Sequence, residues 1–106
     1  MDAFSIELAT DAEGRQVVRP HGEIDLATHT QVAKAVVDLL DAGHVDIVVD
    51  LSHTTFLDST ALGTLISARR RVHARNGSFE IVCSNERLLR IFQVTSLDKV
   101  FTIRKA

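Results

Sequence analysis

Residues 47–66 read IVVDLSHTTFLDSTALGTLI, and this stretch decides the fold. Its start belongs to a short, β-branched apolar run over residues 45–49, which is typical of a central strand covered on both faces. Its end begins an amphipathic helix predicted from Ser59 to Ala74, with Asp58 as the N-cap and Asn76-Gly77 as the stop. A buried strand that leads into an amphipathic helix is typical of an α/β protein.

Upstream of this stretch, the sequence predicts a β-hairpin. Residues 4–9 alternate apolar and polar side chains, residues 11–14 supply turn formers, and residues 16–19 resume an extended apolar pattern. Pro20 follows directly and has no N–H to donate to a ladder. We therefore expect Pro20 at an edge, at a bulge or where hydrogen bonding of the second strand ends.

The hairpin is followed by a first predicted helix. Thr28 and Gln31 have the spacing of a capping box, and Gly43 is placed to end the helix. Apolar residues between them share one helical face. These residues are Val32, Val36, Leu39 and Leu40.

The C-terminal part continues the alternation of strands and helices. Residues 79–83 are predicted as a strand, Ser84 or Asn85 opens a third helix, and residues 100–103 form a last strand or an extended tail. Strands separated by helices require crossover connections and hence partly parallel pairing. The sequence thus predicts one α/β domain over residues 1–106, a mixed sheet of four to five strands with three to four helices packed on it.

Composition excludes several classes of protein. The chain has 106 residues, 45% of them hydrophobic, and a formal charge of −2 without a dominant basic stripe, which argues against direct nucleic-acid binding. The run Arg69-Arg70-Arg71 is expected on a solvated helix face, and Cys83 is expected to be a buried small hydrophobe. No apolar run is long enough for a membrane span or a signal peptide, so we expect a cytoplasmic protein without membrane contact.

The residues give little support to catalysis or metal binding. The five histidines lack paired ligand spacing and the one cysteine offers no thiolate cluster, so no metal or other cofactor is expected. Ser59 lacks the two glycines of a G-x-S-x-G nucleophile elbow, and His53 has no group to orient it as a base. No phosphate-binding glycine motif follows a strand.

Ser59 remains the strongest candidate for a functional residue. A hydroxyl on the first turn of a helix lies where free N–H groups and the helix dipole favour negative charge, so a phosphate is well placed there. From the residues alone, two interpretations stay open: Ser59 is an ordinary first-turn residue, or it accepts a phosphoryl group.

Three segments together resemble the STAS domain family, in particular the bacterial anti-sigma factor antagonists. They are Gly22-Glu23-Ile24-Asp25, Val48-Val49-Asp50-Leu51-Ser52 and the run from Phe56 to Gly63. The similarity continues through residues 88–92 and 97–101, in the family's order and over nearly the whole chain. Two positions depart from the family's common pattern: Thr60, where a second serine is frequent, and Ala61, where glycine is frequent.

The resemblance implies a regulatory binding protein and not an enzyme. It implies that the unphosphorylated chain binds an anti-sigma factor with serine kinase activity, frees a sigma factor, and is switched off by phosphorylation of Ser59. A phosphatase of the PP2C type would reset it. The implied partner-binding residues are Gly22, Glu23, Asp25, Asp58, Ser59 and Thr60. STAS domains also serve as unphosphorylated adaptors in stress-signalling complexes or beside ABC transporters, and this alternative needs no acceptor serine.

Three further residues have roles that the sequence leaves open or predicts only broadly. Asp25 is either a turn former or a partner contact. Phe56 and Leu57 are expected to anchor the loop in the core, with a partner surface as the alternative for Phe56.

Overall fold

The computed structural model describes residues 3–105, which form one sheet and three α-helices. The strands are β1 (Ser5–Thr10), β2 (Gln16–Ile24), β3 (Asp46–Asp50), β4 (Thr54–Leu57), β5 (Ser78–Val82) and β6 (Thr102–Arg104). The helices are α1 (His29–Asp41), α2 (Ser59–Ala74) and α3 (Glu86–Val94), followed by the 3₁₀ turn η1 (Leu97–Lys99). None of the helices in this part of the chain is long and apolar enough to cross a membrane.

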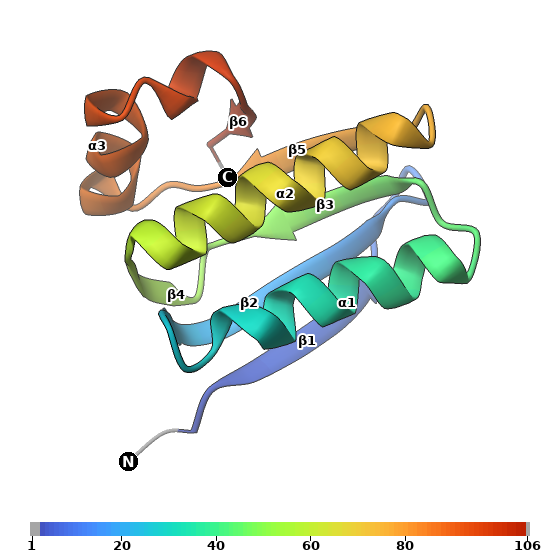
Figure 1. Ribbon diagram of the computed structural model, residues 1–106, viewed down its shortest axis with the longest axis horizontal. Helices are drawn as coiled ribbons and strands as arrows, with labels where there is room; N and C mark the ends of the chain where they lie inside the picture. Colours follow the sequence, from blue (N-terminus) through green and yellow to red (C-terminus); the bar gives the residue numbers. More distant parts are fainter. Residues whose placement is uncertain (1–2, 106) are drawn as a thin grey trace.

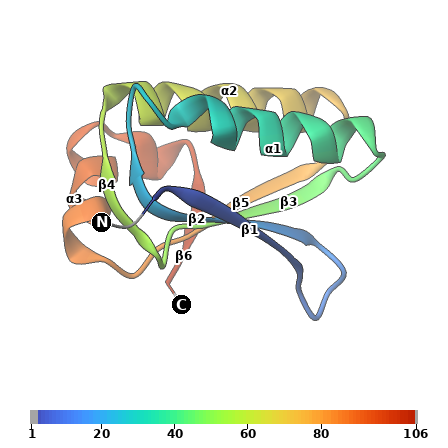
Figure 2. The same ribbon diagram turned by 90° about the horizontal axis from the view of Figure 1, so that it is seen from below.

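The sheet is mixed and has six strands among the described residues, in the order β1-β2-β3-β5-β6, with β4 paired to the far end of β2. The β1–β2 pair is antiparallel and the other four pairs are parallel. Parallel neighbours need a crossover, which includes α1 between β2 and β3, α2 between β3 and β5, and α3 between β5 and β6. The helices α1 and α2 lie side by side over one face of the sheet (Figure 1, Figure 2).

The mixed α/β class is confirmed, and the sheet has one strand more than the four to five predicted. The additional strand is β4, which has only four residues and pairs with β2 alone. Its two ends are buried and its two middle residues are exposed, so it shows no period-2 alternation. A sequence pattern therefore does not distinguish it from a loop.

Pro20 lies at a change of partner within β2. The pairing of β2 with β3 extends to Val18, and the pairing with β4 begins at Gly22. On this side of the strand, Pro20 falls in the gap between the two ladders, and the Pro20 carbonyl accepts a hydrogen bond from the Thr54 hydroxyl, 3.3 Å away. Of the three alternatives predicted for Pro20, the structure is nearest to an end of hydrogen bonding, but only toward β3, because β2 pairs with β1 past Pro20 and with β4 from Gly22 onward.

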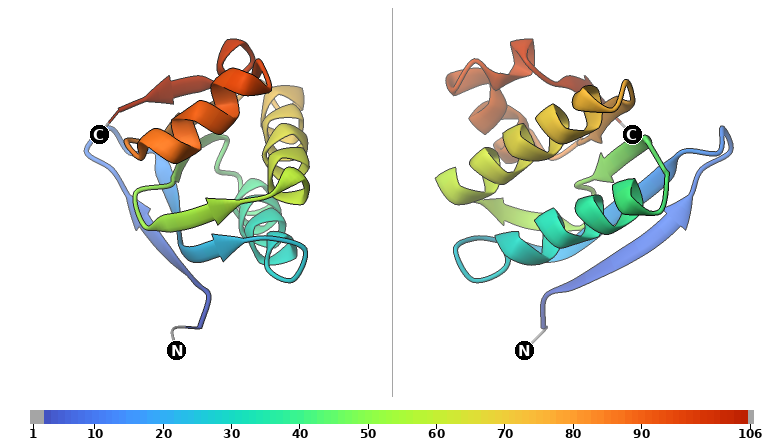
Figure 3. Two further views of the ribbon diagram at one scale, coloured as in Figure 1. Left: turned by 90° about the vertical axis from the view of Figure 1, so that its left-hand side faces the viewer. Right: turned by 45° about the vertical axis from the view of Figure 1, so that its right-hand side comes forward.

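The main core lies between the sheet and the layer formed by α1 and α2. The predicted inward positions of α1 (Val32, Val36 and Leu40) and of α2 (Leu62, Leu65 and Val72) are buried there, together with Cys83. Leu39 and Ile66 are half-buried. The helix α3 and the turn η1 lie at the side of the molecule away from β1 (Figure 3). In this region the ring of Phe92 packs edge-on against that of Phe101.

The other face of the sheet carries no helix layer among residues 3–105 (Figure 2). Val17, Val48 and Val82 form a small separate cluster on it, which buries Val48 as predicted for the central strand. Around this cluster the face is charged: Arg19 donates to Asp50, at 2.8 Å, and to Glu7, at 2.6 Å.

Candidate functional site

Two loops that are far apart in the sequence meet because β2 and β4 run parallel. Ile24 pairs with Leu57, so the next residues, Asp25 and Asp58, emerge together at the same edge of the sheet. The Asp58 N–H donates to the Ile24 carbonyl across this edge, at 3.3 Å. Figure 1 shows β4 and the loop from β2 to α1 at the same end of the molecule. We call this end, built from residues 22–28 and 54–60, the switch end.

Hydrogen bonds made by its own side chains stabilise the first loop of the switch end. The Asp25 carboxylate accepts hydrogen bonds from the Ala27 and Thr28 N–H groups, at 2.9 and 3.1 Å. The Thr28 hydroxyl donates to the Glu23 carbonyl at 2.7 Å and accepts from the Asp25 N–H at 3.0 Å. Gly22 precedes the loop with φ of +113°, a conformation that favours glycine. Asp25 is therefore a turn former.

The predicted capping box at the start of α1 is wrong. Thr28 is the N-cap residue, but its side chain makes no capping hydrogen bond to the helix. The hydroxyl is already engaged by Glu23 and Asp25, because the loop needs it to close. The Asp25 carbonyl accepts hydrogen bonds from the N–H groups of Thr28, the N-cap, and His29, the first residue of α1, at 3.2 and 2.9 Å.

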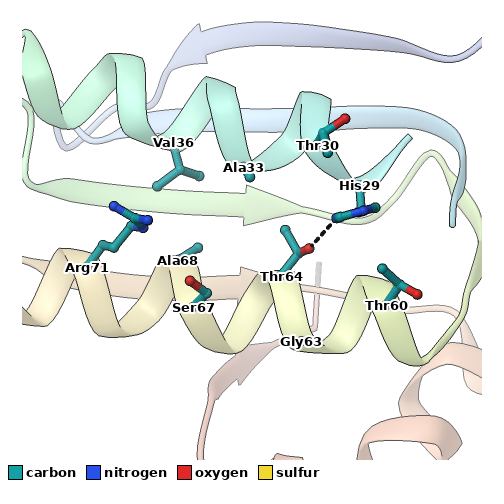
Figure 4. Close-up of a pocket in the computed structure, with 10 residues that line it drawn as sticks. All are labelled: His29, Thr30, Ala33, Val36, Thr60, Gly63, Thr64, Ser67, Ala68 and Arg71. Carbon is teal, nitrogen blue, oxygen red and sulfur yellow. Dashed lines mark hydrogen bonds between the residues drawn. The ribbon is translucent and has the colours of Figure 1, made fainter. Parts of the chain in front are cut away.

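The start of α2 is capped as predicted. The Asp58 side chain accepts a hydrogen bond from the Ala61 N–H at 2.9 Å. Ser59, the first residue of the helix, is exposed, and within residues 3–105 its hydroxyl has no hydrogen-bond partner. Thr60 is half-buried and faces α1 (Figure 4). The two neighbouring hydroxyls therefore differ in access: Ser59 is open to solvent and Thr60 lies at the edge of a groove.

The six residues predicted to bind a partner lie together at the switch end, and two exposed apolar side chains that the sequence reasoning missed or misplaced lie beside them. Leu26, at the tip of the first loop, is 76% exposed, and Phe56 is 46% exposed. The prediction that Phe56 anchors the core is wrong, whereas Leu57 is buried as expected. The register between β2 and β4 shifts after Gly22, which pairs Phe56 with the exposed Glu23. For Leu26, the only available signal was an apolar residue inside a polar turn.

The histidine considered as a base for Ser59 is engaged in a ring contact with another histidine. The ring of His53 stacks on His21, with centroids 4.5 Å apart, and His21 contacts Glu7 at 2.9 Å. No hydrogen bond joins His53 to Ser59 in the described part of the chain. The residues described hold no cluster of three or more histidine, cysteine, aspartate or glutamate side chains suited to a metal ion.

A groove extends from the switch end between α1 and α2 (Figure 4). It has a volume of about 430 Å³ and begins at His29 and Thr60. At this end the His29 Nδ1 atom and the Thr64 hydroxyl are 3.0 Å apart, a hydrogen bond that connects the two helices. The groove ends at Arg71, in the last turn of α2.

Comparisons with known proteins agree with this architecture. The family model of the STAS domain matches residues 8–106. The anti-sigma-B factor antagonist of Bacillus subtilis is 30% identical over 82 residues, which cover 77% of this chain and 74% of that protein.

Solved structures extend the similarity to the fold. The crystal structure of an anti-sigma factor antagonist from Mycobacterium paratuberculosis superposes with a TM-score of 0.84 at 27% identity, covering 95% of this chain and 85% of that one. The phosphorylated form of the Bacillus cell fate determinant SpoIIAA superposes with a TM-score of 0.74 at 19% identity, covering 96% and 91%. On the strength of the family match over residues 8–106 and of this shared architecture, the chain belongs to the STAS domain family.

Proposed function

We propose that this chain is an anti-sigma factor antagonist controlled by phosphorylation. The unphosphorylated form binds an anti-sigma factor with serine kinase activity through the switch end and thereby frees a sigma factor. The same kinase then phosphorylates Ser59, the complex dissociates, and a phosphatase of the PP2C type restores the binding form in the cytoplasm. The observation that carries this proposal is the exposed, unpartnered Ser59 hydroxyl on the first turn of α2.

The two hydroxyls at the start of α2 are not equally suited to a kinase. A kinase must bring the acceptor oxygen in line with the γ-phosphate, so the hydroxyl has to enter the partner's active site. Ser59 is exposed, whereas Thr60 is half-buried and lines the groove beside α1. This difference supports Ser59 as the acceptor.

Phosphorylation at Ser59 should leave the domain folded. A phosphoserine carries about −1.5 to −2 charges at pH 7. At a helix N-terminus this charge gains about 0.3–1 kcal/mol from the helix dipole. The resemblance to the phosphorylated form of SpoIIAA shows that the shared fold accommodates a phosphorylated state in that protein.

Phosphorylation of Ser59 should weaken partner binding much more than it changes the stability of the fold. Two unit charges of the same sign at about 4 Å repel by roughly 1 kcal/mol in water and by about 4 kcal/mol at an effective dielectric constant of 20. Two such contacts and the desolvation of the phosphate would weaken binding by about a hundredfold or more, since about 1.4 kcal/mol corresponds to a factor of ten. Leu26 and Phe56 support a protein partner, because exposed apolar side chains around a site are typical of docking surfaces.

The direct test is phosphorylation with purified components. The chain is incubated with a candidate anti-sigma kinase and Mg-ATP, and the modified residue is mapped by mass spectrometry. We expect phosphate on Ser59 in the wild type and in Thr60→Val, and no phosphate in Ser59→Ala. Modification of Thr60, or of neither residue, would contradict the assignment.

Binding of the same variants tests the switch. Ser59→Ala should bind the anti-sigma factor about as tightly as the wild type, because it removes only a hydroxyl without a partner. Ser59→Asp should bind more weakly, because it places a permanent charge at the helix start. Isothermal titration measures both dissociation constants, and equal values for the two variants would exclude an electrostatic switch.

A further inference from the structure

The groove between α1 and α2 is open to the outside and mostly apolar inside. Ala33 and Val36 of α1 face Ala68 of α2 across it (Figure 4). Small side chains on both helices keep it wide enough for another segment of chain. The hydrogen bond between His29 and Thr64 holds the helices together at the switch end, so the groove is formed before any partner arrives.

Gly63 lies on this groove and has no role in the packing of the domain. A Cβ atom added at Gly63 would meet no atom within 4 Å, and its backbone is ordinary helix. Glycine inside a helix costs about 0.5–1 kcal/mol relative to alanine, and nothing within the described structure requires it here. Close approach of another backbone is the remaining physical use of a glycine on a helix surface.

Arg71 indicates a ligand for the groove independently of Gly63. It closes the groove at the end far from Ser59, it is exposed, and within residues 3–105 it has no hydrogen bond or ion pair. The nearby Arg75, by contrast, donates to the Leu40 carbonyl at 2.7 Å. An unpaired guanidinium at the end of an apolar groove matches a carboxylate, which it can bind in a bidentate manner.

We propose that the groove receives a helix of the anti-sigma factor, with small apolar side chains toward Gly63 and an acidic residue paired with Arg71. This inference rests on the proposed function and extends its interface beyond the switch end. From Thr60 to Arg71 the groove follows α2 for roughly 16 Å at about 1.5 Å per residue, the length of about three helical turns. Because Thr60 lies next to Ser59, a partner seated on the switch end reaches the groove without a gap.

Two matched pairs of variants test the proposal. Arg71→Glu and Arg70→Glu change the charge equally at neighbouring exposed positions of α2, but only Arg71 lines the groove. Gly63→Leu and Gly63→Ala both improve helix propensity, but only leucine fills the groove. Isothermal titration against the candidate anti-sigma factor gives the dissociation constants, and urea denaturation confirms that each variant is folded.

We expect Arg71→Glu and Gly63→Leu to weaken binding about tenfold or more. The matched controls Arg70→Glu and Gly63→Ala should have dissociation constants within about twofold of the wild type. An acidic-to-arginine exchange on the helix of the anti-sigma factor should restore binding to Arg71→Glu. Wild-type affinity for both Arg71→Glu and Gly63→Leu would overturn the groove assignment.

The outcomes separate this inference from the proposed function. If the groove variants bind normally while Ser59 is still phosphorylated, the groove proposal fails and the switch stands. If the groove variants lose binding but no phosphate reaches Ser59, the docking surface stands and the switch fails. A wild-type chain that binds no anti-sigma factor would overturn both.

Discussion

The two long helices begin beside each other, yet the hydroxyls at their starts are in opposite states. At the start of α1, the Thr28 hydroxyl donates to the Glu23 carbonyl and accepts from the Asp25 N–H. At the start of α2, the Ser59 hydroxyl is exposed and has no partner in the described structure. Both belong to residue types that favour helix starts, so the difference between them comes from the connection to the sheet.

The lengths of the two connections explain this difference. Ile24 and Leu57 pair in the sheet, but four residues, 25–28, precede α1, whereas Asp58 alone precedes α2. Side-chain hydrogen bonds stabilise the turn of the longer connection. The Thr28 hydroxyl makes two of these bonds and is therefore not available to other groups. In the shorter connection Asp58 caps the helix alone, and the hydroxyl of Ser59 is left available.

The largest effect on stability should come from replacing the Thr28 hydroxyl by an apolar group, whereas the same kind of replacement at Ser59 should have little effect. Thr28→Val removes two hydrogen bonds worth about 1 kcal/mol each, so the free energy of unfolding should fall by about 2 kcal/mol. Ser59→Ala should change it by less than about 0.5 kcal/mol, as is usual for exposed positions without contacts. Urea denaturation measures both values. A loss in Ser59→Ala as large as that expected for Thr28→Val would show that the Ser59 hydroxyl is hydrogen-bonded in solution.

A smaller effect should follow from the cap of α2. Asp58→Ala removes the hydrogen bond to the Ala61 N–H and should cost about 1 kcal/mol, whereas Asp58→Asn should be close to neutral because asparagine caps equally well. The unfolding midpoint in urea reports both changes. If Asp58→Asn is as destabilising as Asp58→Ala, the contribution of Asp58 lies in its charge and not in its capping bond.

The smallest effect concerns Asp50, a third aspartate at a strand end, which lies on the face of the sheet away from the helices. Burial raises the pKa of its carboxyl, but hydrogen bonds from Arg19 and Ser52 outweigh burial, so the pKa is below its ordinary value. A lowered pKa in the folded state means that the unfolded state binds more protons, so this stabilisation is present above about pH 4 and disappears as the pH falls through the folded-state pKa.

Asp50→Asn tests this contribution to stability. It is also a control variant that should leave phosphorylation at the switch end unchanged. The difference in unfolding free energy between wild type and Asp50→Asn should be greatest at pH 6–7 and shrink toward pH 3, as measured by urea denaturation across that range. A difference that does not vary with pH would contradict the role of the ion pair with Arg19. Phosphorylation of Ser59 should be the same in both proteins.

Much of the secondary structure follows from local patterns. The stripe of α1, the cap of α2 at Asp58 and the β-hairpin depend on the spacing of neighbouring residues, and these predictions are confirmed. The capping box at Thr28 failed because the carbonyl of Glu23, five residues earlier and outside the motif, binds the hydroxyl. The strand β4 and the exposure of Phe56 were missed because both depend on the shifted register with β2.

The sequence by itself determined the family, the α/β class and Ser59 as the residue to test. Short-range periodicity, capping residues and the order of the motifs can all be recognised from the sequence. Only the tertiary structure decided which of the neighbouring hydroxyls is free, and that Gly63 and Arg71 border a groove formed with α1. These properties depend on the parallel pairing of β2 with β4 and on the packing of α1 against α2. Such contacts join residues distant in the sequence, and the pattern around each residue does not encode its spatial neighbours.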